Sequence, residues 1–101
     1  MQLEASSVGV LLDESLNQYV HERLRTSFRS VEKKIRSVTI RVGTQATDCD
    51  STKHYCTLIV RLNRGGLVSG ADVGAELHSI IDRVVDEVGC AVARQVKSHW
   101  W

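Results

Sequence analysis

Residues 12–42 read LDESLNQYVHERLRTSFRSVEKKIRSVTIRV, and the spacing of the apolar side chains changes within this stretch. In the first part they recur every three or four positions, which predicts one long amphipathic helix with Asp13 as its N-cap. The apolar positions of this helix are Leu12, Leu16, Val20, Leu24, Phe28, Val31 and Ile35. From Val38 to Val42 apolar and polar residues alternate, so a half-buried strand is predicted directly after the helix.

The flanking sequence predicts three further strands. Residues 2–8 can form a strand before the helix, whereas residues 43–53 are polar and predict a loop. Alternation at residues 56–62 predicts a strand, and the sequence NRGG that follows predicts a tight turn. A short strand over residues 67–71 would complete that hairpin.

Helical spacing returns from about Asp72 to the end of the chain. The apolar positions of this second helix are Leu77, Ile81, Val84, Val88, Val92 and Val96. Gly89 lies inside it at a cost of about 1 kcal/mol relative to alanine, which suggests close packing against the first helix.

The order of elements is therefore β-α-β-β-β-α, which predicts an α+β fold. The first two strands are joined through a helix and should be parallel, while the short connections make the others antiparallel. Two helices packed on one face of a four-stranded mixed sheet would bury every apolar stripe at once. The opposite face should meet solvent, and it carries Thr39, Arg41, Thr57, Ile59 and Arg61.

Length and composition predict one globular domain over residues 1–101. The chain is 43% hydrophobic and 25% charged, with 13 basic and 12 acidic residues and a net charge of +1. It contains no apolar run of about 20 residues and no secretory signal, so we expect no membrane partner. Three irregularly spaced cysteines indicate reduced thiols and a cytoplasmic protein.

Positive charge is concentrated despite this overall balance. Seven basic residues and one acidic residue, Glu32, lie between Arg23 and Arg41. Such a segregated field is a candidate phosphate-binding surface, and the alternative is a solvated helix face. The predicted surface has three parts. They are a ridge at positions i, i+4 and i+8 of the first helix, the basic residues that follow at the C-terminus of that helix, and two residues of the second helix. These residues are Arg25, Arg29, Lys33, Lys34, Arg36, Arg94 and Lys97. Arg83 is expected to pair with Glu87 instead.

Motifs of catalysis are missing from the sequence: it has no GxSxG, HExxH, CxxC or phosphate-binding glycine loop. We therefore expect a protein that is not an enzyme, with no cofactor and no small-molecule substrate. One cluster contains potential metal ligands: Asp48, Cys49, Asp50, His54 and Cys56. Its spacing fits a zinc site badly, and Cys56 falls on the core-facing side of its strand, so no metal is predicted.

Several segments, taken in order, resemble the ribosome-associated inhibitor and hibernation-promoting factor family, also called the sigma-54 modulation protein family, in its short form. They are MQL at 1–3, LDESLNQYVHERL at 12–24, KKIRSVTIRV at 33–42, IIDRVV at 80–85 and ARQV at 93–96. The resemblance covers nearly the whole chain. It implies the same β-α-β-β-β-α domain.

The resemblance also implies a partner, the small ribosomal subunit, bound in the channel for messenger and transfer RNA. Such proteins stop initiation and preserve idle ribosomes under stress. The seven predicted basic residues would then contact the rRNA backbone.

A second hypothesis is a protein–protein regulatory module of the same fold that has lost rRNA binding and uses the open sheet face or Trp100 and Trp101. A third is a double-stranded RNA-binding domain, although the expected loop signatures are not evident.

Overall fold

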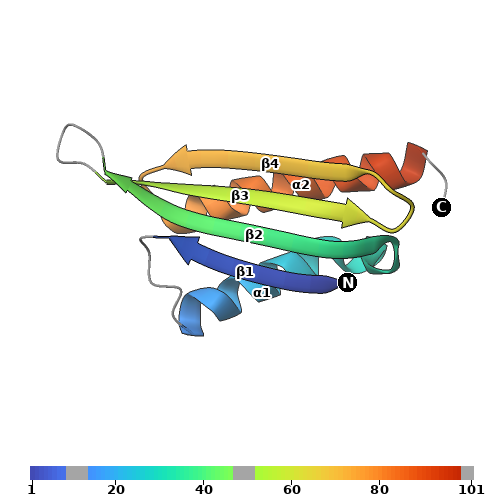
Figure 1. The fold of residues 1–101 in the computed structure, drawn as a ribbon, viewed down its shortest axis with the longest axis horizontal. Helices are drawn as coiled ribbons and strands as arrows, with labels where there is room; N and C mark the ends of the chain where they lie inside the picture. Colours follow the sequence, from blue (N-terminus) through green and yellow to red (C-terminus); the bar gives the residue numbers. More distant parts are fainter. Residues whose placement is uncertain (9–13, 47–51, 99–101) are drawn as a thin grey trace.

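The computed structural model describes residues 1–8, 14–46 and 52–98, and it confirms the predicted order of elements (Figure 1). The elements are β1 (Gln2–Val8), α1 (Glu14–Phe28), the 3₁₀ helix η1 (Arg29–Lys34), β2 (Ile35–Ala46), β3 (Thr52–Leu62), β4 (Leu67–Gly74) and α2 (Leu77–Ser98). The sheet order is β1-β2-β3-β4. As predicted, β1 is parallel to β2 and the other neighbours are antiparallel.

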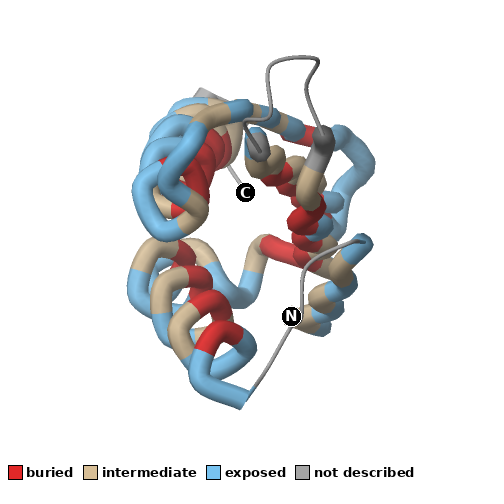
Figure 2. Tube along the Cα trace, turned by 90° about the vertical axis from the view of Figure 1, so that its left-hand side faces the viewer, coloured by how far each residue is buried: buried red, intermediate tan, exposed pale blue. Residues whose placement is uncertain are grey.

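Both helices lie on the same face of the sheet, and the buried positions line the sides of the helices and strands that face each other (Figure 2). The core forms between the two layers. It contains Leu16, Leu24 and Phe28 of α1 and a row of α2 side chains, which are packed against Val38, Leu58 and their neighbours in the sheet. The core formed in this way is entirely apolar among the described residues. Apolar burial at roughly 25 cal/mol per Å² is therefore the main force that holds the two layers together.

The helices run in the same direction. Tyr19, Arg23 and Ser27 of α1 lie opposite successively later residues of α2, because their neighbours there are residues 82, 86 and 89. The C-terminal ends of α1 and α2 consequently reach the same end of the sheet (Figure 1).

The first helix is shorter than predicted. It changes to a 3₁₀ helix at Arg29, and Ile35 begins β2 instead of ending the helical stripe. Asn63, in the turn between β3 and β4, explains why the helical segment ends at Lys34. Its side-chain nitrogen donates to the carbonyl of Lys33 (2.7 Å), and its backbone N–H donates to the carbonyl of Lys34 (2.9 Å). These bonds satisfy carbonyls that would otherwise be unpaired at a helix end.

The start of β2 contains an irregularity between Ile35 and Ser37. In a regular strand Ile35 and Val38 would face opposite sides, because their separation is an odd number of residues. Both are fully buried here, since the extra residue, Arg36, is accommodated as a bulge and stays exposed. The bulge thus keeps Ile35 in the core and turns Arg36 toward solvent.

The predicted loop over 43–53 was partly wrong, because β2 continues to Ala46 and β3 begins at Thr52. Gly43 and Tyr55 are register partners in this extension. A Cβ atom on Gly43 would collide with the Tyr55 ring, so the ring lies over the glycine. A cross-strand glycine–aromatic pair of this kind allows β2 and β3 to stay paired through a polar segment that the sequence pattern predicted as a loop.

The second helix was also predicted to begin too early. Residues from Asp72 to Gly74 belong to β4, and α2 begins at Leu77. At Gly70 a Cβ atom would lie 2.7 Å from Val88, so this glycine allows α2 to pack closely on β4. Gly89 has no such role, because its Cβ would meet Ser27 at an ordinary 3.9 Å.

Candidate nucleic-acid interface

Positive side chains collect at the end of the molecule where both helices terminate, on the right in Figure 1. We call this surface the basic end. It comprises Arg29, Lys33, Lys34, Arg36, Arg61, Arg64, Arg94 and Lys97. Four separate segments contribute: η1, the start of β2, the β3–β4 hairpin and the last turns of α2. The basic end is therefore a product of the tertiary fold, not of one stretch of sequence.

The turn between β3 and β4 connects these segments. Asn63 binds the carbonyls of Lys33 and Lys34, as described above, and so fixes η1 beside the turn. On its other side, Gly66 lies against α2, since a Cβ atom there would be 3.2 Å from the Gln95 side-chain nitrogen. Gly65 and Gly66 have positive φ angles of 80° and 101°, which glycine adopts without strain.

The segments that form the basic end contain almost no opposing charge, although Glu4 of the neighbouring strand β1 lines the same depression as Arg61. Among the described residues of these four segments, Glu32 is the one carboxylate against eight cations. Seven of the eight side chains are exposed and Lys34 is half-buried, while Lys34, Arg64 and Arg94 also contact other groups within the protein. The cations lie where the two helix dipoles present their negative ends, which favours positive charge there.

The predicted ridge on the first helix is modified. Arg25 is exposed in the last turn of α1, one turn from Arg29. Lys33 does not continue the row, because η1 has about three residues per turn and a separation of four residues rotates the side chain away from Arg29. Six of the seven predicted cations therefore lie around one end of the molecule, with Arg25 one turn behind them on α1, and they do not form a straight row.

Two members of the basic end, Arg61 and Arg64, were missing from the predicted surface. A topological signal could have identified them. Because β3 is antiparallel to β2, the end of β3 and the turn after it must lie beside the start of β2. Any basic residue near the NRGG turn is thus brought next to residues 34–36.

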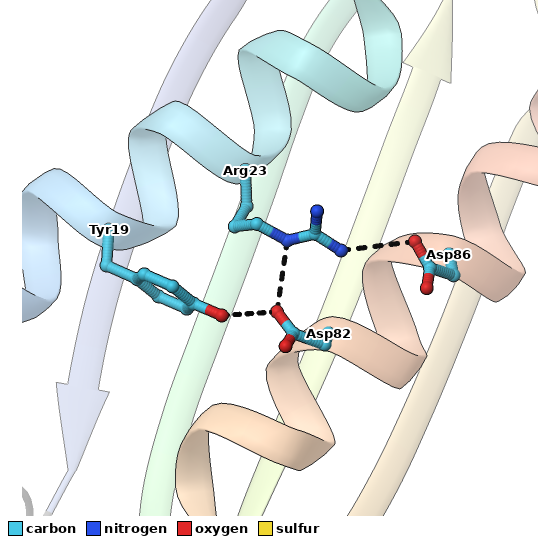
Figure 3. A network of polar contacts seen from close by, with 4 residues as sticks. All are labelled: Tyr19, Arg23, Asp82 and Asp86. Carbon is cyan, nitrogen blue, oxygen red and sulfur yellow. Dashed lines mark hydrogen bonds and ion pairs between the residues drawn. The ribbon is translucent and has the colours of Figure 1, made fainter.

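Arg23, in contrast, is held by carboxylates between the helices (Figure 3). Its Nε lies 3.0 Å from Asp82 Oδ1 without hydrogen-bond geometry, so this contact is Coulombic, and its terminal nitrogen donates to Asp86 at 3.2 Å. The Tyr19 hydroxyl donates to the same oxygen of Asp82 at 2.5 Å. Burial, followed by this hydrogen bond, raises the pKa of Tyr19. We call these four residues the interhelix network, and its role is to join α1 to α2.

Arg83 is likewise paired, although the predicted partner was wrong. Its Nε lies 3.1 Å from Asp72 Oδ2 on β4, and not against Glu87. The Asp72 carboxylate also accepts the Val73 N–H at 2.9 Å. Arg83 therefore ties the outer side of α2 to β4.

The open face of the sheet carries the predicted residues. Thr39, Thr57 and Ile59 are half-buried around a shallow depression, and Arg41 and Arg61 are exposed. Trp100 and Trp101, the other surface considered for a protein partner, lie outside the described residues.

The cluster of possible metal ligands is not assembled by the described part of the chain. Cys56 is fully buried in the core, as predicted, and burial raises the pKa of its thiol to about 12. His54 Nδ1 lies 3.2 Å from the Thr44 hydroxyl. Asp48, Cys49 and Asp50 lie outside the described residues, and no group of three His, Cys, Asp or Glu side chains with metal-binding geometry occurs in the remainder.

No protein-family model and no curated protein sequence matches the chain. Several solved structures are similar, and two of them match over nearly their whole lengths. The N-terminal domain of Thermus thermophilus Protein Y superposes with a TM-score of 0.71 and 23% identity, covering 93% of this chain and 98% of that domain. A ribosomal subunit interface protein from Coxiella burnetii superposes with a TM-score of 0.79 and 13% identity, covering 94% and 97%.

The chain has the Protein Y fold. The predicted fold class, two helices on a four-stranded mixed sheet, is thus confirmed by the structure and by these neighbours. None of the described helices is long and apolar enough to cross a membrane.

Proposed function

We propose that this chain is a ribosome-associated translation inhibitor of the hibernation type, which binds the rRNA of the small subunit in the channel for messenger and transfer RNA. The observation that carries the proposal is the basic end. Eight cations from four segments lie at that end of the molecule, with Arg61 on the open face of the sheet, and Glu32 is the one carboxylate in the described part of those segments.

The chemistry of the basic end suits a phosphate backbone. Guanidinium groups bind phosphate through two parallel hydrogen bonds, and lysines add charge. Aromatic side chains for base stacking are absent from the described residues of the basic end, so recognition depends on the backbone and on shape. Because the whole chain has a net charge of only +1, its positive field is confined to one end and would orient the molecule on a polyanion.

The similarity to solved structures supports the same partner. One of the two neighbours is described as a ribosomal subunit interface protein, and the other is the N-terminal domain of Protein Y. Together with the sequence resemblance, this supports membership of the hibernation-promoting factor family. In that role the protein is cytoplasmic and needs no catalytic group.

Co-sedimentation with purified small ribosomal subunits tests the proposal. We expect the triple variant Lys33→Glu, Arg94→Glu, Lys97→Glu to lose at least about 100-fold in affinity, since each charge-assisted contact contributes about 1.5 kcal/mol or more. Lys97→Glu and Lys53→Glu form a matched pair, because both lysines are exposed and undergo the same change of charge at opposite ends of the molecule. Only Lys97→Glu should weaken binding.

Circular dichroism of each variant provides the control for folding. A folded triple variant that co-sediments like the wild type would contradict the proposal.

The alternative function, a protein–protein regulatory module, has one supporting observation: the sheet face around Ile59 is uncovered. That alternative would be favoured if the chain captured a single protein partner in a nuclease-insensitive manner and bound no ribosomal subunits.

A further inference from the structure

The two edges of the sheet differ in the protection that their side chains provide. Edge strands usually carry a charge, a proline or a bulge that prevents pairing with another strand. On β1 the exposed residues include Glu4 in the middle of the strand. The exposed residues of β4 are Leu67, Ser69, Ala71 and Val73, and the one charged side chain of the strand, Asp72, is half-buried on the helix side and paired with Arg83.

Exposed apolar side chains are also concentrated on β4. Three large hydrophobic residues are exposed in the described structure, and two of them, Leu67 (50% exposed) and Val73 (51%), lie on this strand. The third, Val8, lies on the opposite edge. Leu67 and Val73 are six residues apart and hence on the same face of the sheet.

We propose that β4 is a self-association surface, at which two copies of this chain pair antiparallel through their β4 strands and extend the sheet from four strands to eight. A symmetric pairing about Gly70 brings Leu67 of each copy opposite Val73 of the partner subunit, and Ser69 opposite Ala71. The two apolar side chains on each side of the axis would then cover one another.

Backbone groups are available for this pairing. The Leu62 N–H donates to the Gly66 carbonyl, and ladder bonds alternate along an antiparallel pair, so the odd-numbered residues of β4 direct their backbone groups away from β3. These are the residues that the proposed pairing would bond. Asp72 already accepts the Val73 N–H, so the bonds between Ser69 and Ala71 would form most of the new ladder.

Charge complementarity identifies a second copy as the occupant. The molecule has its basic end beside the start of β4, with Arg64 in the turn, and carboxylates near the end of β4, with Glu76 before α2. Antiparallel pairing about Gly70 brings the β3–β4 turn of one copy, which contains Arg64, toward the segment of the partner subunit between β4 and α2, which contains Glu76. Each contact occurs twice in the symmetric dimer.

The helices have room in this arrangement. α2 contacts both β3 and β4, so its axis lies about half a strand spacing inside β4. With strands about 4.8 Å apart, two α2 helices would be separated by about 9–10 Å across the axis, which is within the usual range for packed helices.

Sedimentation equilibrium of the full chain tests the proposal. The wild type should show a concentration-dependent rise from monomer to twice that mass, and this rise should weaken with salt. Leu67→Lys and Val73→Lys should each raise the dissociation constant at least tenfold, whereas the matched variant Val8→Lys on the other edge should leave it unchanged. A wild type that stays monomeric at millimolar concentration, or equal loss of the dimer in Val8→Lys, would overturn the proposal.

Two further sets of variants keep the test independent of folding. Ser69→Lys alters an exposed polar side chain outside the core, so a folded Ser69→Lys variant that still dimerises would also overturn the proposal. Arg64→Glu and Glu76→Arg should each weaken the dimer, and the combination should restore it, since the swap reverses both partners. Failure of the combination to restore the dimer would contradict the proposed register.

Discussion

Removing the Tyr19 hydroxyl should weaken the packing of α1 against α2 without disturbing the fold. In the interhelix network this hydroxyl donates to Asp82 Oδ1 at 2.5 Å, and Asp82 also attracts Arg23. Tyr19→Phe keeps the ring and removes only the donor. We expect this variant to lower the free energy of unfolding by about 1–1.5 kcal/mol.

The expected loss in the free energy of unfolding follows from the solvent exposure of the Asp82 side chain. Hydrogen bonds to charged groups contribute about 1.5–3 kcal/mol, but the Asp82 side chain is 42% exposed, so this bond should contribute no more than the lower limit of that range. The ion pair between Arg23 and Asp82 is exposed to a similar degree and contributes at most about 1 kcal/mol. Asp82→Ala removes both contacts and should therefore cost about 2 kcal/mol, because Arg23 keeps its bond to Asp86.

Urea unfolding of the wild type, Tyr19→Phe, Asp82→Ala and the double variant forms a double-mutant cycle. We expect a coupling energy of about 1 kcal/mol between Tyr19 and Asp82, with an unchanged dependence on urea. Binding to ribosomal subunits should be unaffected in Tyr19→Phe, since the network lies apart from the basic end. A coupling energy below about 0.3 kcal/mol would refute the assignment of a joining role to this network.

Three other predictions concern stability and thiol chemistry. Gly89→Ala should raise the free energy of unfolding by about 1 kcal/mol, measured by urea denaturation, because the new methyl group meets Ser27 at an ordinary contact distance; a loss of stability would contradict this. Alkylation of the native protein followed by peptide mapping should modify the exposed Cys90 and leave the buried Cys56 unmodified until urea is added, and native labelling of Cys56 would show that the core opens readily. The pKa values of Tyr19 and Cys56 are raised in the folded state, that of Cys56 from 9.0 to about 12. The protonated side chains therefore contribute fully to stability below the pKa values of the unfolded chain, and this contribution is lost as the pH rises through the pKa values of the folded state. The urea midpoint should consequently fall as the pH rises from 9 toward 12, by less in Tyr19→Phe, and a midpoint that rises over this range would exclude the linkage.

Local periodicity predicted most of the fold because each element buries one apolar face. Errors occurred where tertiary contacts decide the local structure. The sequence pattern cannot reveal that Asn63 ends the helical segment by binding carbonyls some 30 positions earlier. Nor does it reveal that the Tyr55 ring covers Gly43 and so continues a ladder through residues that look like a loop.

The candidate site was predictable only in part for the same reason. Charge along the first helix identified Arg29 and Lys33, and the family resemblance directed attention to the end of the second helix. Whether a given arginine stays available depends on its neighbours across the fold. Arg23 lies in the same basic stretch but is held by Asp82 and Asp86, whereas Arg64 joins the basic end through the hairpin.

The salt dependence of binding to small ribosomal subunits tests the central claim most directly. If the basic end contacts about five phosphates, the logarithm of the association constant should fall by about 3.5–4.5 for each tenfold rise in salt. The triple variant Lys33→Glu, Arg94→Glu, Lys97→Glu should reduce that slope by about 2 or more. A wild-type slope near zero, or the same slope in the folded triple variant, would contradict the account.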